Sequence, residues 1–406
     1  MSILLLTGCS GRIFTVTVSN PTDSDRPLEM VEICHQQIVD ALGDGIFVVK
    51  DSDGNEISHQ VTYDGKVIFQ TELKANESAT YSIVKGKPSD YENLISGKQY
   101  PERADDFAWE NDLVGFRAYG PALQASGEKG FGYDLFAKRG THLPVLESFY
   151  DLALGERTDR IYQELLLEDA DKAETYRLDS MTFHIDRGFG MDVYAVGPNM
   201  GAGVTALVDD EIIYPWCYKD YEILDNGPLR ITFKLTFLPV AVGEDNNVVE
   251  TRVISLDAGS YLNRTEVLYQ NLTQPKKLVA GIVLRDKDGK ETADIQKGYM
   301  AYPAPAMNFD PRRPDLDNGT HFIGHVYPET MSEMKTVYHS EKERLEERGG
   351  APGHLLSYTE YTPGEKFTYY WGFGWEHSQM KTYDQWKEYL EAFAEMVKNP
   401  LIVNAE

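Results

Sequence analysis

Short runs in which apolar and polar residues alternate recur along most of this chain. They include Phe14–Val18, Val67–Leu73, Leu229–Phe237, Val248–Leu256 and Phe367–Trp371. A period of two places one set of side chains on each face of a β-strand. Turn-forming clusters at 20–25 and 51–54 separate the first strands at the close spacing of a β-sandwich. The pattern predicts a mostly β protein built from long strands in large packed sheets.

One segment has the periodicity of a helix. Residues 382–385 have the sequence of a capping box, and Trp386, Leu390, Phe393 and Val397 then recur on one helical face. Between the strands we expect no amphipathic helices, which excludes a βαβ architecture. We expect N-terminal β-sandwich strands over 10–87, a main domain over 100–400 and a boundary near 86–90.

The first nine residues differ from the rest of the chain. The apolar run 3–6 ends at Thr7-Gly8-Cys9, and this is the form of a bacterial lipobox, whose cysteine receives lipid after cleavage. We therefore expect 1–9 to be a signal-peptide remnant and Cys9 to anchor an outer-membrane lipoprotein of a bacterial envelope, facing the periplasm or the surface. The alternative is a chance apolar N-terminus. No later run reaches the ~20 apolar residues of a spanning helix.

The net charge of the chain limits which classes of ligand it can bind. Lys and Arg total 39 against 65 Asp and Glu, a formal net charge of −26, which argues against nucleic acid as a partner. The electric field of this negative charge repels anionic polymers, so a uronic acid ligand requires a local basic pocket. The sequence allows either a disulfide between Cys34 and Cys217 or two separate thiols.

No metal site or other cofactor is expected. His321 and His325 are four residues apart, but 320–327 reads as a strand broken by Gly324, which places them ~13 Å from each other. The acidic cluster of Asp105, Asp106 and Asp112 permits Ca²⁺, although its spacing does not specify the ion.

An acidic and aromatic segment, 105–112, leads directly into a strand at 113–120. On that strand Arg117 and Tyr119 share the face opposite the apolar residues. With Trp109 they supply a planar donor, a phenol and an aromatic platform, which suits a sugar. The alternative is an acidic turn that caps backbone N–H groups, with Arg117 paired to one carboxylate.

A second segment, 183–197, surrounds Gly188 and Gly190. His184 and Arg187 lie at the mouth of this turn, and Asp192 and Tyr194 are expected on one face of a following strand. Histidine, carboxylate and phenol are the usual parts for proton transfer on a saccharide. A histidine that merely satisfies hydrogen bonds is the alternative. His142 follows two basic residues and adds a second histidine.

A third segment, 369–377, alternates aromatic residues with glycine. Four aromatic side chains on one face favour a core role over a binding platform. The glycine face leaves Tyr370 and Glu376 beside open backbone, where a strand or a ligand comes close.

With these motifs together, the chain resembles the family catalogued as domain of unknown function 4861. The resemblance is carried by 106–112, 116–123, 188–198, 226–230 and 369–375. It implies a fold similar to the galactose-mutarotase-like β-supersandwich, whose members mostly act on or hold carbohydrate across a concave sheet face. It implies no particular reaction.

We therefore expect an envelope lipoprotein that acts on an oligosaccharide or polysaccharide, as a polysaccharide lyase or a glycoside hydrolase in glycan utilisation. A lyase would use His184 or His142 and a tyrosine for proton transfer, with Arg117 and Arg187 neutralising a uronate. A non-catalytic glycan-binding lipoprotein is the alternative, and a purely structural envelope protein is a weaker one. The candidate catalytic residues are His184, Tyr194, Asp192 and His142, and the candidate substrate-binding residues are Trp109, Glu110, Asp112, Arg117, Tyr119, Arg187, Tyr370 and Trp375.

Overall fold

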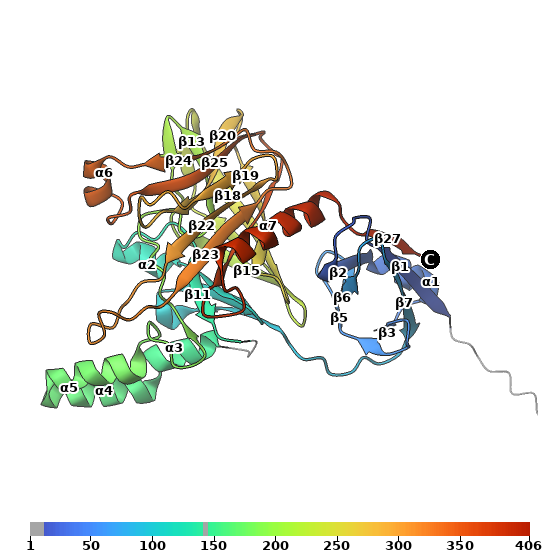
Figure 1. Cartoon of the computed structure of the whole chain (residues 1–406), viewed down its shortest axis with the longest axis horizontal. Coiled ribbons are helices and arrows are strands. Elements are labelled where there is room, and N and C mark those ends of the chain that lie inside the picture. The colour runs from blue at the N-terminus through green and yellow to red at the C-terminus, as the bar shows by residue number, and fades with distance from the viewer. Residues whose placement is uncertain (1–11, 141–144) are drawn as a thin grey trace, which may run out of the picture. The chain divides into compact units, whose positions relative to one another are not determined.

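A computed structural model describes residues 12–140 and 145–406. The described chain forms two compact units (Figure 1). The first contains residues 12–93, 227–229 and 399–406, and the second contains residues 94–226 and 230–398. The last eight residues of the chain thus complete the unit that the first residues begin.

The first unit is a β-sandwich around one apolar core. Its elements are β1 (Ile13–Ser19), β2 (Arg26–Cys34), α1 (His35–Leu42), β3 (Phe47–Lys50), β4 (Glu56–Ile57), β5 (His59–Val61), β6 (Lys66–Leu73), β7 (Ser78–Lys85) and β27 (Ile402–Ala405). One sheet has the order β27-β1-β7-β3-β4 and the other the order β2-β6-β5. Val16, Phe69 and Ile83 are fully buried between them. The alternation that predicted these strands places their apolar face in this core.

The second unit contains three antiparallel sheets. One five-stranded sheet comprises β8 (Ile95–Tyr100), β9 (Asp106–Asn111), β10 (Gly115–Ala118), β11 (Asp134–Lys138) and β12 (Gly190–Met191). The other comprises β13 (Val204–Asp209), β14 (Glu211–Ile213), β20 (Lys276–Val283), β24 (Glu333–Tyr338) and β25 (Gly353–Tyr361). The nine-stranded sheet comprises β15 (Tyr218–Asn226), β16 (Arg230–Phe237), β17 (Val240–Val242), β18 (Asp245–Asp257), β19 (Leu262–Gln270), β21 (Thr292–Asp294), β22 (Tyr299–Pro305), β23 (Thr320–Val326) and β26 (Phe367–Trp375).

Both five-stranded sheets cover the same face of the nine-stranded sheet. On one side the Trp109 ring lies 4.7 Å from the Phe233 ring, between ring centroids. On the other side the Tyr369 hydroxyl donates to the Gly203 carbonyl at 2.8 Å. An isolated parallel bridge, Tyr133 to Gly201, joins the two covering sheets. These large antiparallel sheets confirm the predicted mostly β, sandwich-like fold class.

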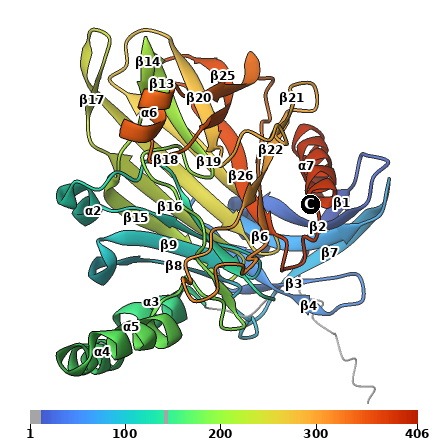
Figure 2. The same cartoon turned by 60° about the vertical axis from the view of Figure 1, so that its left-hand side comes forward.

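Helix α7 (Tyr383–Lys398) covers the opposite face of the nine-stranded sheet (Figure 2). Thr382 Oγ1 accepts a hydrogen bond from the Gln385 N–H at 3.2 Å, as the capping box predicted. The buried face of the helix includes Trp386 and Leu390. A side chain at Gly324 would place its Cβ 2.5 Å from Leu390 Cδ1, so glycine lets the helix approach. Strand β23 therefore runs through Gly324, and the predicted break there is wrong.

The expectation of no helices between the strands is wrong. Within the second unit lie η1 (Pro101–Arg103), α2 (Pro121–Ser126), α3 (Leu146–Leu154), α4 (Glu156–Glu168), α5 (Ala170–Tyr176), the π-turn η2 (Arg177–Met181) and α6 (Glu341–Glu346). Helix α3 buries Leu146, Phe149 and Tyr150 against the outer face of the β8–β12 sheet. Helix α4 buries no residue, although Ile161, Leu165 and their neighbours Tyr162 and Leu166 recur at helical spacing, so its sequence does carry a helical pattern. Strand pairing stays antiparallel, and the exclusion of a βαβ architecture is confirmed.

None of the helices in the described chain is long and apolar enough to span a membrane. Cys9 and the rest of the predicted lipobox lie outside the described residues. Cys34 and Cys217 are free thiols. Burial raises the pKa of the Cys217 thiol to about 12.

Candidate functional site

The outer face of the β8–β12 sheet carries a buried ion cluster centred on Arg117. Arg117 pairs directly with Asp134 across the β10–β11 ladder, and its Nε donates to Asp134 Oδ2 at 3.1 Å. Its Nη2 donates to Asp192 Oδ2 at 3.0 Å, and its Nη1 to Asp106 Oδ2 at 3.3 Å. The guanidinium is 4% exposed, so three carboxyl groups share one enclosed cation.

The cluster holds more acid than base. Burial raises the pKa of Asp192 well above its ordinary value, and the neighbouring Asp134 adds to the rise. Burial likewise raises the pKa of Asp106. The cluster therefore retains a proton at a pH where exposed aspartates are ionised. Tyr119 donates to Asp134 Oδ2 at 2.8 Å, and Tyr150 of α3 to Asp106 Oδ2 at 3.3 Å.

His184 connects this cluster to the surface. Its Nδ1 lies 2.6 Å from the Asp192 carbonyl oxygen and 3.8 Å from Asp192 Oδ2, and its side chain is 33% exposed. A carbonyl only accepts, so Nδ1 carries the proton and Nε2 is the free basic nitrogen of the neutral ring. Burial lowers the pKa of His184, against the effect of the bond to Asp192.

The glycine loop 183–192 fixes the position of His184. Gly188 and Gly190 have φ values of 98° and 127°, which favour glycine. Asp186 Oδ1 accepts hydrogen bonds from both of their N–H groups, at 2.8 and 3.2 Å. Gly190 then enters β12 against Lys138 of β11. The strand expected after the loop, with Asp192 and Tyr194 on one face, is shorter than predicted, because regular pairing ends at Met191.

Two neighbours complete the surroundings of His184. The Phe309 ring lies 4.9 Å from the imidazole, between centroids, and Phe309 is 38% exposed. The half-buried Arg103 lowers the pKa of His184 through its charge, as a smaller effect than burial. No hydrogen bond or ion pair joins the Arg103 guanidinium to any residue of 12–140 or 145–406. A base and an aromatic ring thus meet at one partly exposed place, and the charge of Arg103 acts on that base.

Arg103 is held by unusual backbone. The next two residues, Ala104 and Asp105, have φ values of 53° and 60°, in the left-handed region. Asp105 packs so closely on Gly120 that no other residue fits there. Such strain persists where packing enforces it, often beside functional groups.

Tyr194 lies in a second buried polar group behind the glycine loop. Its ring lies 5.4 Å from the Arg285 guanidinium carbon and 5.9 Å from the His321 ring, between centroids in the second case. The Tyr194 hydroxyl, Arg285 Nη2 and both His321 nitrogens have no hydrogen-bond partner among the described residues. Burial raises the pKa of Tyr194 and lowers that of His321 to about 4. Tyr194 therefore resists deprotonation and is a poor base.

Several predicted binding residues are structural. Trp109 is 0% exposed and donates from Nε1 to Asn263 Oδ1 at 2.7 Å, so it is a core residue and no sugar can stack on it. Glu110 accepts from Lys138 Nζ at 2.7 Å and from the Leu146 N–H at 3.0 Å, at the start of α3. Asp112 accepts from the Gly259 N–H at 2.7 Å.

The remaining predicted residues lie elsewhere or support the loop. Trp375 is buried, with Nε1 donating to the Asn318 carbonyl at 2.9 Å, and Tyr370 packs its ring on Phe393 of α7. Arg187 donates to the carbonyls of Ile185 and Leu178, at 2.9 and 3.1 Å. It therefore ties the loop to η2 and is not free for a uronate. His142 lies outside the described residues.

Contrary to the prediction, Arg117 is not available to bind a substrate carboxylate, because its guanidinium is already paired with three aspartates. The paired alternative is correct here, although its partners Asp134 and Asp192 lie far from the acidic turn in sequence. The suggested Ca²⁺ set is dispersed: Asp105 Oδ2 accepts from the Ala122 N–H at 3.1 Å, and Asp106 and Asp112 have their own partners. In the described part of the chain, no three His, Cys, Asp or Glu side chains are arranged to hold a metal.

Sequence reasoning did not select four neighbours of the site: Asp134, Tyr150, Phe309 and Arg103. The alternation of Asp134 and Lys138 on β11 indicated a polar outer face that could have pointed to Asp134. Phe309 and Arg103 carry no local signal, because only folding brings them to His184.

A family model described as "Domain of unknown function (DUF4861)" matches residues 18–403. The chain belongs to the DUF4861 family. A curated relative, "Uncharacterized protein P7" of Formosa agariphila, is 26% identical over 421 residues, which cover 96% of this chain and 93% of that protein. The resemblance of the sequence motifs to this family is confirmed.

Two solved structures resemble this DUF4861 protein. One is a protein in the glycosyl hydrolase family 38 from Enterococcus faecalis, with a TM-score of 0.48 at 9% identity. The other is an alpha-mannosidase from Enterococcus faecalis V583, with a TM-score of 0.46 at 8% identity. Each match covers 97% of this chain, but 47% and 46% of those chains, so this chain spans about half their length.

Proposed function

We propose that this DUF4861 protein is a carbohydrate-active enzyme in which His184 transfers a proton on a uronate-containing glycan. The observation that carries the proposal is the partly exposed imidazole whose Nδ1–H is fixed on the Asp192 carbonyl, which leaves Nε2 basic. General bases need such access and a suitable pKa, and a lowered pKa keeps the ring neutral at pH 7.

The reaction type follows from which groups are accessible. Hydrolysis by two carboxylates needs both to reach the glycosidic bond. Asp106, Asp134 and Asp192 are at most 1% exposed and are bound to Arg117. We therefore favour the lyase over the hydrolase.

An elimination step fits the groups around His184. Nε2 takes the proton from the carbon beside the uronate carboxylate, and Arg103 stabilises the negative charge that develops there. A carbon–carbon double bond forms as the glycosidic carbon–oxygen bond breaks, and the departing oxygen receives the proton from His184. The products are an unsaturated uronate and a new reducing end. Phe309 offers a ring face to a neighbouring sugar.

Two further considerations support a carbohydrate ligand. The large antiparallel sheets agree with the galactose-mutarotase-like fold implied by the sequence, whose members mostly act on or hold carbohydrate. The net charge of −26 repels polyuronates at long range, and an unpaired Arg103 is the local cation that such a ligand requires. Fold analogy alone assigns no chemistry, so the assignment depends on the site.

A non-catalytic glycan-binding role is the second candidate. One observation favours it: burial raises the pKa of both Tyr119 and Tyr194, which removes the phenols as a second base. In that case His184 and Phe309 bind the sugar without turnover.

The test is a polysaccharide panel of plant, algal and host origin, including polyuronates. Each reaction is read for ultraviolet absorbance of unsaturated uronates and for new reducing ends. Both signals together support the lyase, provided that His184→Ala loses them and the matched control His35→Ala keeps them. Reducing ends alone contradict the elimination. Binding without either signal supports the capture protein.

We also propose that the chain is an envelope lipoprotein anchored through Cys9. The sequence around Cys9 supports this proposal. Labelled palmitate supplied to cells making the full-length protein, and its Cys9→Ala variant, tests it. Label on the unaltered protein alone supports the anchor, and equal label on both contradicts it.

A further inference from the structure

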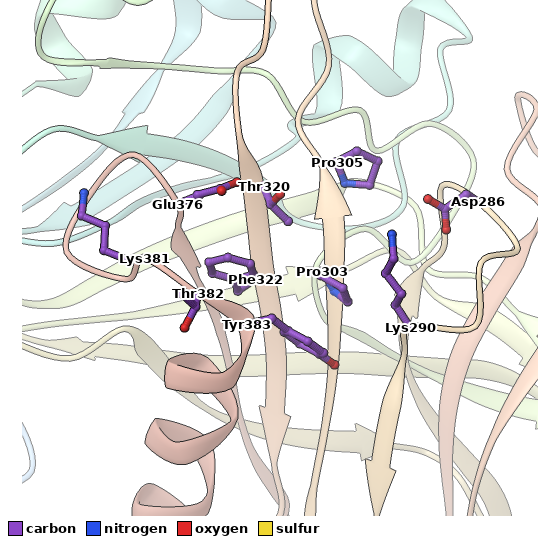
Figure 3. Close-up of a pocket in the computed structure, with 10 residues that line it drawn as sticks. All are labelled: Asp286, Lys290, Pro303, Pro305, Thr320, Phe322, Glu376, Lys381, Thr382 and Tyr383. Carbon is purple, nitrogen blue, oxygen red and sulfur yellow. The ribbon is translucent and has the colours of Figure 1, made fainter.

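A cleft on the outer face of the nine-stranded sheet lies apart from the residues of the His184 site. It has a volume of about 390 Å³, within the range of small-ligand clefts. Strands β22 and β23 form its floor, and the start of α7 forms one wall (Figure 3).

Ring side chains make the floor flat. Pro303 lies directly opposite Phe322, and Pro305 opposite Thr320, in the β22–β23 ladder. Prolines fit there because β21 pairs with β22 only over Tyr299–Ala301, so no further strand needs their missing N–H groups. The Tyr383 ring stacks on Phe322 with centroids 6.1 Å apart. Its hydroxyl donates to the Ala301 carbonyl at 3.0 Å, which fixes the ring.

Charged side chains flank these rings on two sides. Glu376 and Lys381 lie on one side, and Asp286 and Lys290 on the other (Figure 3). Lys290 already pairs with Asp288 at 2.5 Å, so among the lining residues Glu376 and Asp286 are matched by a single available lysine, Lys381. Within the described residues, the side chains of Glu376 and Lys381 have no hydrogen-bond or ion-pair partner. A carboxylate and an ammonium are therefore available to a ligand.

We infer that this cleft binds a neutral stretch of an oligosaccharide chain. The apolar C–H faces of sugar rings pack on flat rings such as Phe322 and Pro305, and hydroxyl groups pair with both carboxylates and ammonium groups. Because the rim carries no net positive charge, it favours a neutral ligand over a polyuronate. The inference does not depend on catalysis at His184, because the two sites share no residue.

The experiment is calorimetric titration of the purified protein with cello-, laminari-, manno- and xylohexaose, and with trigalacturonate as the anionic comparison. We expect at least one neutral hexasaccharide to bind more tightly than trigalacturonate. The double variant Glu376→Gln/Lys381→Met should raise its Kd at least about tenfold, since two charged hydrogen-bonding groups are lost. Glu388→Gln, an exposed α7 residue that does not line the cleft, is the matched control and should leave Kd unchanged.

A His184→Ala titration separates this proposal from the enzymatic one. Neutral-sugar affinity that survives in His184→Ala and falls in the double variant supports the cleft, whether or not the enzyme assay succeeds. Three results overturn the proposal: no neutral hexasaccharide binds, affinity is unchanged in the double variant, or affinity is lost in His184→Ala. Circular dichroism of each variant confirms that the fold is retained.

Discussion

His184 is held by Asp192 through the backbone and lies near its carboxyl group as well. Nδ1 donates to the Asp192 carbonyl at 2.6 Å, and the same nitrogen lies 3.8 Å from Asp192 Oδ2. Asp192 in turn binds Arg117 at 3.0 Å. A movement of the buried ion cluster therefore reaches the partly exposed imidazole through one residue.

The pH dependence of turnover should follow the fraction of His184 that carries a neutral imidazole. Because burial lowers the pKa of His184 below 6.5, turnover should be at its plateau by neutral pH and fall on acidification, with its midpoint below pH 6.5. Initial rates on the best substrate across this range check the prediction. A rate that rises as pH falls would mean that the protonated ring is the active form.

Removing the charge at Arg103 should move the pKa of His184 upward. The positive charge of Arg103 opposes protonation of the ring, so Arg103→Gln should raise that pKa towards 6.5. Nuclear magnetic resonance titration of the imidazole measures the shift. Uronate turnover should fall at least about tenfold as well. Arg160→Gln, an exposed α4 residue, is the control, and equal behaviour of both variants would place Arg103 away from the site.

Arg117 should matter for stability. Arg117→Met leaves three buried carboxyl groups without their cation and should lower the free energy of unfolding by about 3–5 kcal/mol. Urea unfolding measures this loss. The exposed pair of Arg177 with Glu174 offers a contrast, because Arg177→Met should cost less than about 1 kcal/mol. Adding Asp134→Asn to Arg117→Met should recover part of the loss, and a loss that instead deepens would contradict this account.

His321 should make the fold sensitive to acid. Its pKa is about 4 in the folded protein and 6.5 when exposed, so only the unfolded chain binds this proton between those values. Proton uptake by the unfolded chain therefore costs the fold nothing above pH 6.5 and destabilises it as pH falls towards 4, by up to about 1.4 kcal/mol per pH unit. His321→Leu should flatten this dependence without loss at pH 7, because neither nitrogen has a described partner. Denaturant unfolding at several pH values measures the free energy of unfolding of both proteins. The same pH dependence in the unaltered protein and in His321→Leu would contradict the role given to His321.

Gly324 should be required for the contact between β23 and α7. Gly324→Ala places a methyl group against Leu390 and should cost about 1–3 kcal/mol. In the double variant Gly324→Ala/Leu390→Ala the two losses should be less than additive, because the smaller side chain makes room. Thermal unfolding of the three variants measures this coupling, and strict additivity would show that the methyl group is accommodated elsewhere.

The sequence alone determined the strands, the capped terminal helix and the family. These depend on local chemistry, namely the period of two in runs such as Leu229–Phe237, the Thr382 cap and motifs contiguous in the chain. It also identified the glycine loop and His184 as candidates. Helices α3 to α5 were missed, although Ile161 and Leu165 of α4 recur at helical spacing and α3 buries Leu146, Phe149 and Tyr150.

The tertiary structure decided which of the chemical groups are available. Trp109 and Arg117 looked like ligand-binding residues because sequence gives residue type and strand face, whereas burial depends on what packs over that face. The nine-stranded sheet covers the face of Trp109, and helix α3 covers the opposite face, where Arg117 is enclosed by Asp106, Asp134 and Asp192 from three separate segments. The uncommitted cation, Arg103, and the aromatic neighbour, Phe309, lie about 80 and 125 residues from His184 along the chain. Only long-range packing, which no local pattern encodes, brings Phe309 against His184 and the charge of Arg103 within range of it.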